Sequence, residues 1–175
     1  METETLSPAI PREVDDLTQR VLKAAERRNV RLGTAESCTG GLLASLLTDV
    51  DGLGHCFDRG IVAYSNESKR DLLGVPPQLI AEFGAVSEEV AREMAKGALA
   101  KSDADVLVAI TGFAGKAGSD DEPGLVHFAC VGVDGKVSHA EHHFGDIGRG
   151  GVRVEALKVA LEMLLEQIQL KEADS

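Results

Sequence analysis

Three turns of the sequence carry side chains that could do chemistry, and the first of them contains a serine. Ser37 lies in the segment 36–41, Glu-Ser-Cys-Thr-Gly-Gly, between a short apolar stretch and a leucine-rich one. A helix N-terminus exposes unpaired N–H groups, and Gly40 and Gly41 let the backbone approach a ligand closely, so this turn could hold an oxyanion or a phosphate. A serine N-cap followed by the glycines of a tight turn is the alternative. Cys38 is a rival nucleophile, since a helix start favours a thiolate, although most free cysteines are small buried residues.

The second turn supplies the base that a serine nucleophile needs. Lys69 ends the segment 65–69, expected to be a polar turn, and this segment follows an apolar strand that ends in Tyr64, the one tyrosine of the chain. Lysine serves as a base where desolvation lowers its pKa, and the tyrosine hydroxyl could relay or orient a proton. A surface lysine beside Glu67 and a tyrosine at the edge of the core are the alternative interpretation.

The third turn is the Gly-rich segment 112–124, which could act as an adaptable loop over a small ligand. Its spacing does not match that of a phosphate-binding P-loop. Arg149 and Arg153, at the start of the last expected helix, are four residues apart and therefore share a helix face. Two arginines so placed could clamp a phosphate, and an ordinary exposed helix start is the alternative.

Metal-ligating residues are present but do not form a recognisable site. Strand alternation places His139 and His143 on one face and His142 on the other, which leaves too few ligands for zinc. The acidic run 120–122 has the character of a solvated loop. We therefore expect no metal and no cofactor.

Length, charge and composition limit the class of protein. The chain has 175 residues, 18 basic and 29 acidic side chains and a formal net charge of −11, so no basic surplus exists to bind nucleic-acid phosphates or anionic lipid. Aromatic residues make up 3%, which argues against a base-stacking platform. There is no Cys-x-x-Cys pair, no signal-peptide pattern and no apolar run of membrane-spanning length. We expect a reduced, cytoplasmic protein with no nucleic-acid or membrane partner.

Helical and strand patterns alternate along the chain before a hairpin near the end. We expect helices over about 11–28, 42–47, 87–99 and 149–170, and a further helical stretch that Pro76-Pro77 breaks. We expect strands over about 30–34, 60–64, 105–111, 125–133 and 137–143. Asp134-Gly135 is a strong hairpin signal between the last two strands. The pattern predicts a three-layer α/β/α sandwich around a mixed β-sheet, as a single domain over 11–170 after a flexible tail over 1–10. The long apolar last helix is compatible with a homo-oligomer.

Five stretches of the chain resemble the CinA C-terminal domain family, the nicotinamide-nucleotide amidases. They are 34–43, 59–69, 73–75, 84–88 and 111–115, and the strings Glu-Ser-Cys-Thr-Gly-Gly and Tyr-Ser-Asn-Glu-x-Lys among them are specific. The resemblance covers about residues 12–168. It implies a metal-free enzyme that hydrolyses nicotinamide mononucleotide to nicotinic acid mononucleotide and ammonia, with a pyridine nucleotide as its small-molecule partner.

The resemblance also implies roles for single residues. Ser37 matches the nucleophile, Lys69 the general base and Tyr64 the supporting hydroxyl, which favours Ser37 over Cys38. The residues expected to bind the substrate are Thr39, Gly40, Gly41, Gly112, Gly115, Arg149 and Arg153. Lys116 stands where the family has a proline, and this departure motivates the alternative of a catalytically weakened nucleotide-binding module of the same fold. An interaction protein that partners a separate enzyme is a third reading.

Overall fold

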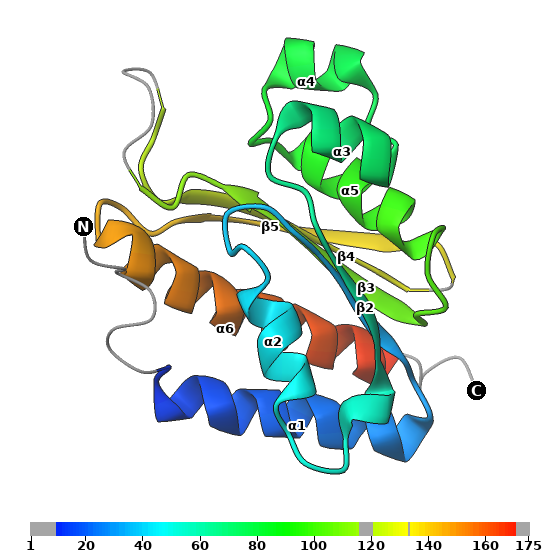
Figure 1. Cartoon of the computed structure of the whole chain (residues 1–175). Helices are drawn as coiled ribbons and strands as arrows, with labels where there is room; N and C mark the ends of the chain where they lie inside the picture. The colour runs from blue at the N-terminus through cyan, green and yellow to red at the C-terminus, as the bar shows by residue number, and fades with distance from the viewer. Residues whose placement is uncertain (1–9, 116–120, 133, 171–175) are drawn as a thin grey trace.

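A mixed five-stranded sheet forms the middle layer of the computed structural model, which describes residues 10–115, 121–132 and 134–170 (Figure 1). The strands are β1 (Leu32–Glu36), β2 (Phe57–Val62), β3 (Val106–Gly112), β4 (Leu125–Gly132) and β5 (Val137–His143). Their order is β2-β1-β3-β4-β5, with β1 parallel to β2 and β3, and with β4 antiparallel to β3 and β5. The predicted mixed sheet and its terminal hairpin are confirmed.

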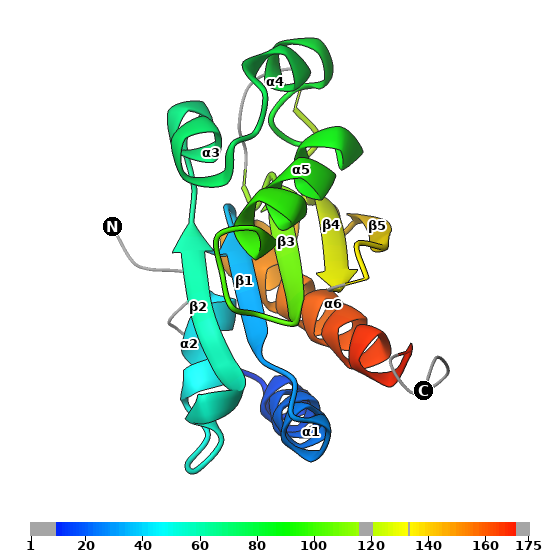
Figure 2. The same ribbon diagram turned by 90° about the vertical axis from the view of Figure 1, so that its right-hand side faces the viewer.

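Helices cover both faces of this sheet, and Figure 2 shows α5 in front of the strands and α6 behind them. They are α1 (Arg12–Arg28), α2 (Leu42–Thr48), α3 (Asn66–Leu73), α4 (Pro77–Phe83), α5 (Glu88–Leu99) and α6 (Gly148–Leu170), with a 3₁₀ turn over Gly54–Cys56. On one face lie α2 and α6, with α1 packed against both of them. On the other face α5 lies along the sheet and carries α3 and α4 near the strand ends. The three-layer sandwich predicted from the sequence is confirmed.

Strand β3 shows why an apolar sequence is needed in the middle of such a sandwich. Its alternate side chains point to opposite faces. Val108 and Ile110 are buried in the core formed with α1, α2 and α6, whereas Leu107 and Ala109 are buried in the core formed with α5. The sheet therefore lies between two apolar cores, and polar groups at the ends of its strands do not disturb either core.

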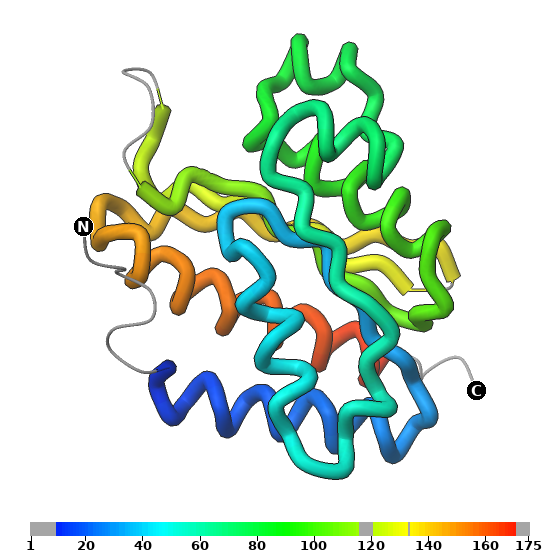
Figure 3. The backbone as a smooth tube through the Cα atoms, viewed as in Figure 1, coloured from blue at the N-terminus to red at the C-terminus, as the bar shows by residue number. Residues whose placement is uncertain are grey.

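Segment 65–69, expected to be a polar turn, is instead the start of helix α3. Ser65 is its N-cap, and the Ser65 hydroxyl accepts a hydrogen bond from the Ser68 N–H at 3.1 Å. A helical stretch that Pro76-Pro77 breaks was expected, but not its start at Asn66. The helix spans eight residues and buries only Lys69 and Leu73, too few for an apolar stripe that would mark where it begins. Figure 3 follows the chain from β2 through this helix to α4 and α5.

Gly97 on α5 determines how closely α3 packs on that helix. A Cβ at this position would overlap the backbone carbonyl oxygen of Leu73, the last residue of α3. No other residue type fits this contact without moving one of the two helices. Because α3 carries Lys69, the contact also helps to position the amine of that side chain.

The expected N-terminal tail lies outside the described residues, except for Ile10, which is half-buried against the core. The first helix ends as expected at Asn29, whose left-handed φ of 50° closes it. Within the described ranges, no helix has the length and apolar character needed to cross a membrane.

Candidate active site

The three parallel strands β1, β2 and β3 end at the same edge of the sheet (Figure 2). The chain crosses from β1 to β2 through α2 on one face, and from β2 to β3 through α3, α4 and α5 on the other. The edge beyond β1 is therefore a topological switch point, the usual ligand site of an open α/β sheet. Ser37, Tyr64 and Gly112, which the sequence analysis singled out, lie at or just beyond these strand ends.

Ser37 follows β1 directly and begins a tight turn. Its N–H continues the sheet by donating to the Ile110 carbonyl at 3.0 Å, and its own carbonyl accepts from the Gly40 N–H at 3.1 Å. Gly40 and Gly41 have φ values of 65° and 94°, so the turn needs glycine at both positions. The turn leaves the Ser37 side chain at the strand edge, 6% exposed.

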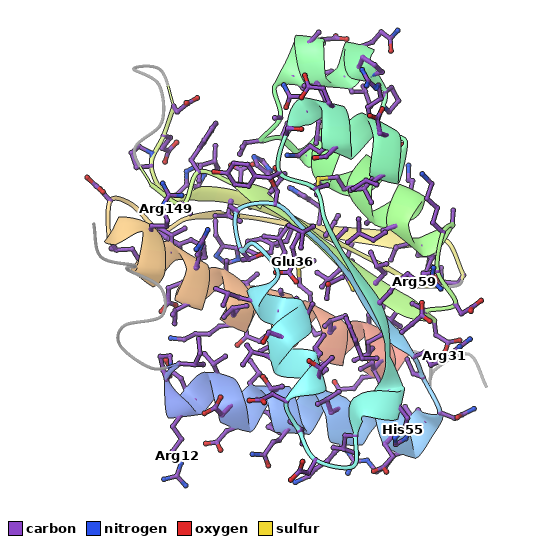
Figure 4. The ribbon with its side chains drawn as sticks, in the orientation of Figure 1. Arg12, Arg31, Glu36, His55, Arg59 and Arg149 are labelled. Atoms are coloured by element: carbon purple, nitrogen blue, oxygen red, sulfur yellow. The ribbon has the colours of Figure 1, made fainter. Side chains whose placement is uncertain are left out.

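Glu36 closes the N-terminus of α2, a role that the sequence analysis missed. Its fully buried carboxylate accepts hydrogen bonds from the N–H groups of Gly41 at 3.0 Å, Leu43 at 3.1 Å and Ala44 at 2.8 Å. Figure 4 shows Glu36 at this end of α2. The expectation that this helix terminus is open to an oxyanion or a phosphate is therefore wrong for these three N–H groups. The sequence did contain a signal for this capping role, because a glutamate at the end of an apolar strand needs hydrogen-bond partners when it is buried.

Lys69 reaches Ser37 from the first turn of α3. Its Nζ lies 2.9 Å from Ser37 Oγ and 3.2 Å from the Tyr64 carbonyl oxygen, and both contacts are hydrogen bonds. The side chain is only 2% exposed, and among the described residues it forms no ion pair with a carboxylate. Burial penalises the charged ammonium and so lowers the pKa of Lys69 below its ordinary value. The structure thus brings together a serine hydroxyl and a lysine amine with a reduced tendency to hold a proton.

Tyr64 contacts this pair through its backbone. The carbonyl oxygen accepts a hydrogen bond from Lys69 Nζ, while the side chain, just beyond the end of β2, is 65% exposed. The carbonyl thus helps to aim the amine at Ser37 Oγ.

Cys38 is unsuited to act as the nucleophile. Its side chain is buried, and burial raises the pKa of the thiol to about 12. At neutral pH the group therefore remains a thiol, which is far less nucleophilic than a thiolate. Of the two candidate nucleophiles in this turn, the geometry and the electrostatics favour Ser37.

Thr39 is buried between the nucleophile and α2. Its Oγ1 has no hydrogen-bond partner among the described residues.

The two arginines at the start of α6 reach two different segments of the site. Arg153 Nε donates to the Cys38 carbonyl at 2.7 Å. Arg149, labelled in Figure 4, lies over Gly115 instead, since a Cβ added to that glycine would stand 3.1 Å from Arg149 Nη2. The helix start thus adds positive charge beside both the serine turn and the Gly-rich loop.

The Gly-rich loop is described on either side of residues 116–120, so Lys116 lies outside the described residues. Gly112 has a packing reason to be glycine, because a Cβ there would lie 2.8 Å from the Leu125 carbonyl oxygen. It pairs with Val126 of β4 at the end of β3, and its role in substrate binding stays a prediction.

The histidines of β5 lie on opposite faces, as the alternation predicted. His139 Nε2 is 3.1 Å from His127 Nδ1 on the α5 side, whereas His142 stacks on Phe144 toward the other core. In the part of the chain that the structure describes, no group of three or more His, Cys, Asp or Glu side chains is arranged to hold a metal ion.

Comparisons with known proteins place this geometry in a family. The CinA C-terminal domain matches residues 14–168 of the chain. The nicotinamide-nucleotide amidohydrolase PncC of Escherichia coli K12 is 42% identical over 158 residues, which cover 89% of this chain and 94% of that protein. A CinA-like protein of Synechococcus sp. (strain RCC307) is 46% identical over 157 residues, which cover 88% of this chain.

Solved structures agree with the sequence matches. The competence/damage inducible protein CihA from Agrobacterium tumefaciens superposes with a TM-score of 0.87 at 43% identity, over 90% of this chain and 96% of that one. The lengths of the relatives differ, because this chain spans only 37%, 33% and 28% of three longer ones.

Proposed function

The chain belongs to the CinA C-terminal domain family, and from this we propose that it is a cytoplasmic amidohydrolase that releases ammonia from nicotinamide mononucleotide. The observation that carries the proposal is the 2.9 Å contact between Lys69 Nζ and Ser37 Oγ at the switch point of the sheet. Support for the substrate comes from the name of a relative that this chain matches over almost its whole length, a nicotinamide-nucleotide amidohydrolase.

In the proposed reaction, the neutral amine of Lys69 takes the proton of the Ser37 hydroxyl as Oγ attacks the carboxamide carbon. The tetrahedral intermediate then collapses, the C–N bond breaks, and Lys69 returns the proton to the departing ammonia. Water hydrolyses the resulting ester by the same proton route, which releases the carboxylate product and restores the serine. These steps use protein side chains and water alone.

The oxyanion of this intermediate needs a donor, and we assign this role to the N–H of Cys38, which follows the nucleophile directly. A backbone N–H beside the nucleophile is a common oxyanion donor. The substrate phosphate would meet the positive charge of Arg149 and Arg153, in a chain whose net charge of −11 otherwise repels it.

Ammonia release from nicotinamide mononucleotide tests this proposal through two neighbouring substitutions. We expect Ser37→Ala to abolish release, because no other side chain replaces Oγ beside Lys69. Cys38→Ala is the matched control and should keep most of the activity, since its thiol stays protonated. Full activity in Ser37→Ala would refute the proposal. Nucleotide binding measured by calorimetry without any ammonia in the unaltered protein would favour the binding-module alternative.

A further inference from the structure

We infer that Arg153 is a positioning residue for the turn that carries the nucleophile, separately from any contact with a substrate phosphate. The inference deepens the proposed function and rests on Ser37 being the reactive group. It assigns to one arginine of the α6 pair a role in the rate of the chemical step, and leaves to the other a role in binding.

The inference rests on one hydrogen bond between residues that are far apart in the chain. Arg153 Nε donates to the carbonyl oxygen of Cys38 at 2.7 Å, although the two residues are 115 positions apart in the chain. A guanidinium donor makes this a charge-assisted hydrogen bond, stronger than one between neutral groups. The same guanidinium lies along the turn, because a Cβ added to Gly40 would stand 3.6 Å from Arg153 Nη2.

Apart from two hydrogen bonds inside it, from the Gly40 N–H to the Ser37 carbonyl and from the Leu42 N–H to the Thr39 carbonyl, the turn is held by hydrogen bonds at its two ends. At the start, the Ser37 N–H is tied to the Ile110 carbonyl of β3. At the far end, Glu36 holds the Gly41 N–H. Between these ends lies Gly40, and glycine has the widest conformational freedom of any residue type, so a further hydrogen bond in this part restricts the conformation of the turn.

Arg153 holds the middle of the turn at the peptide that follows Cys38. A peptide unit is planar, so holding the Cys38 carbonyl fixes the orientation of that whole peptide. Ser37 directly precedes Cys38, and its Oγ lies 2.9 Å from Lys69 Nζ, a distance that the reaction needs. Small misplacements of a reacting group are costly in rate, so loss of the anchor should appear in the reaction of Ser37 itself.

Arg149 provides the contrast within the same helix. It has the same charge and lies one turn earlier, and its guanidinium lies over Gly115 of the Gly-rich loop. If both arginines served the phosphate alone, their loss would affect only reactions in which a phosphate is bound.

The test compares substitutions at position 153 by the rate at which Ser37 reacts with a fluorophosphonate, which carries no nucleotide phosphate. Arg153→Ala removes the donor, whereas Arg153→Gln removes the charge but keeps an N–H donor at the position of Nε. We expect labelling of Ser37 to slow by about tenfold or more in Arg153→Ala, because the charge-assisted hydrogen bond is lost. In Arg153→Gln we expect it to recover to within about threefold of the unaltered protein, because the amide restores a neutral hydrogen bond. Arg20→Ala, an exposed arginine of α1, is the control for loss of charge and should label at the unaltered rate.

Steady-state kinetics on nicotinamide mononucleotide give the second readout. Positioning predicts a lower kcat in Arg153→Ala, whereas a phosphate contact alone predicts a higher KM at unchanged kcat. Unchanged labelling in Arg153→Ala, or equal slowing in Arg153→Ala and Arg153→Gln, would overturn the inference. Labelling that follows the expected order in a protein that releases no ammonia would overturn the proposed substrate and leave the inference standing.

Discussion

Replacing Lys69 by methionine should change how the stability of the protein depends on pH. The side chain is 2% exposed, and burial lowers the pKa of its amine in the folded state. In the unfolded chain the amine has its ordinary pKa of about 10.4. Methionine has a similar length and no charge, so the variant lacks this one titration.

The sign follows from proton binding in the two states. Between the lowered folded-state pKa and about 10.4, the unfolded chain binds more protons at Lys69 than the folded chain does, so the free energy of unfolding rises with pH. The penalty for burying the ammonium is fully present below the folded-state pKa and has vanished above about 10.4. Each pKa unit of lowering corresponds to about 1.4 kcal/mol of stability recovered across that window.

Urea unfolding of both proteins, in steps from pH 6 to pH 11, measures this effect. We expect the free energy of unfolding of the unaltered protein, minus that of Lys69→Met, to rise with pH across the window and then to level. The hydrogen bonds lost with the lysine shift this difference by a constant and do not change its slope. Parallel curves for the two proteins would refute the claim that the folded protein favours the neutral amine. The same variant should lose about 10²–10⁴-fold in kcat, the usual contribution of a general base.

Two further substitutions test the supports of the site through stability. Glu36→Gln replaces a carboxylate oxygen by an NH₂ group that faces N–H donors of α2, so we expect a loss of about 1–3 kcal/mol in urea unfolding, with the exposed Glu82→Gln as an unchanged control. A loss no larger than that of Glu82→Gln would contradict the capping role. Gly97→Ala should cost about 1–3 kcal/mol and also lower kcat, because the added methyl displaces the helix that carries Lys69. Gly54→Ala, where a Cβ meets nothing within 4 Å, is its control, and equal stability of the two variants would contradict the close contact.

The layers of this fold were predictable because they depend on patterns that repeat over many residues. The apolar run of β3 and the Asp134-Gly135 signal between β4 and β5 both indicated their elements, and the structure has both. Boundaries were less accurate, since strand ends follow pairing with a neighbour. The first strand was expected to end at Thr34, but it continues to Glu36, because its pairing with β3 extends to that residue.

The site was only partly predictable, because its main contacts join residues far apart in the chain. Candidate residue types were visible at the turns, but periodicity does not report that Lys69 and Ser37 meet across 32 positions, or that Arg153 meets Cys38 across 115. The short helix α3 buries too little apolar surface to give a helical pattern that marks its start in the sequence. The role of Glu36 was hidden for a related reason, since a buried glutamate is explained only by the N–H groups that surround it.

The most direct test of the account is the pH dependence of Ser37 labelling by a fluorophosphonate, with the labelled peptide identified by mass spectrometry. If a neutral Lys69 activates Ser37, the labelling rate of the unaltered protein should rise with pH to a plateau, and the midpoint of the rise should lie below about pH 10.4. The Lys69→Met variant should label much more slowly and should not show this rise. Labelling at another residue, or a rate that is independent of Lys69 at every pH, would contradict the account.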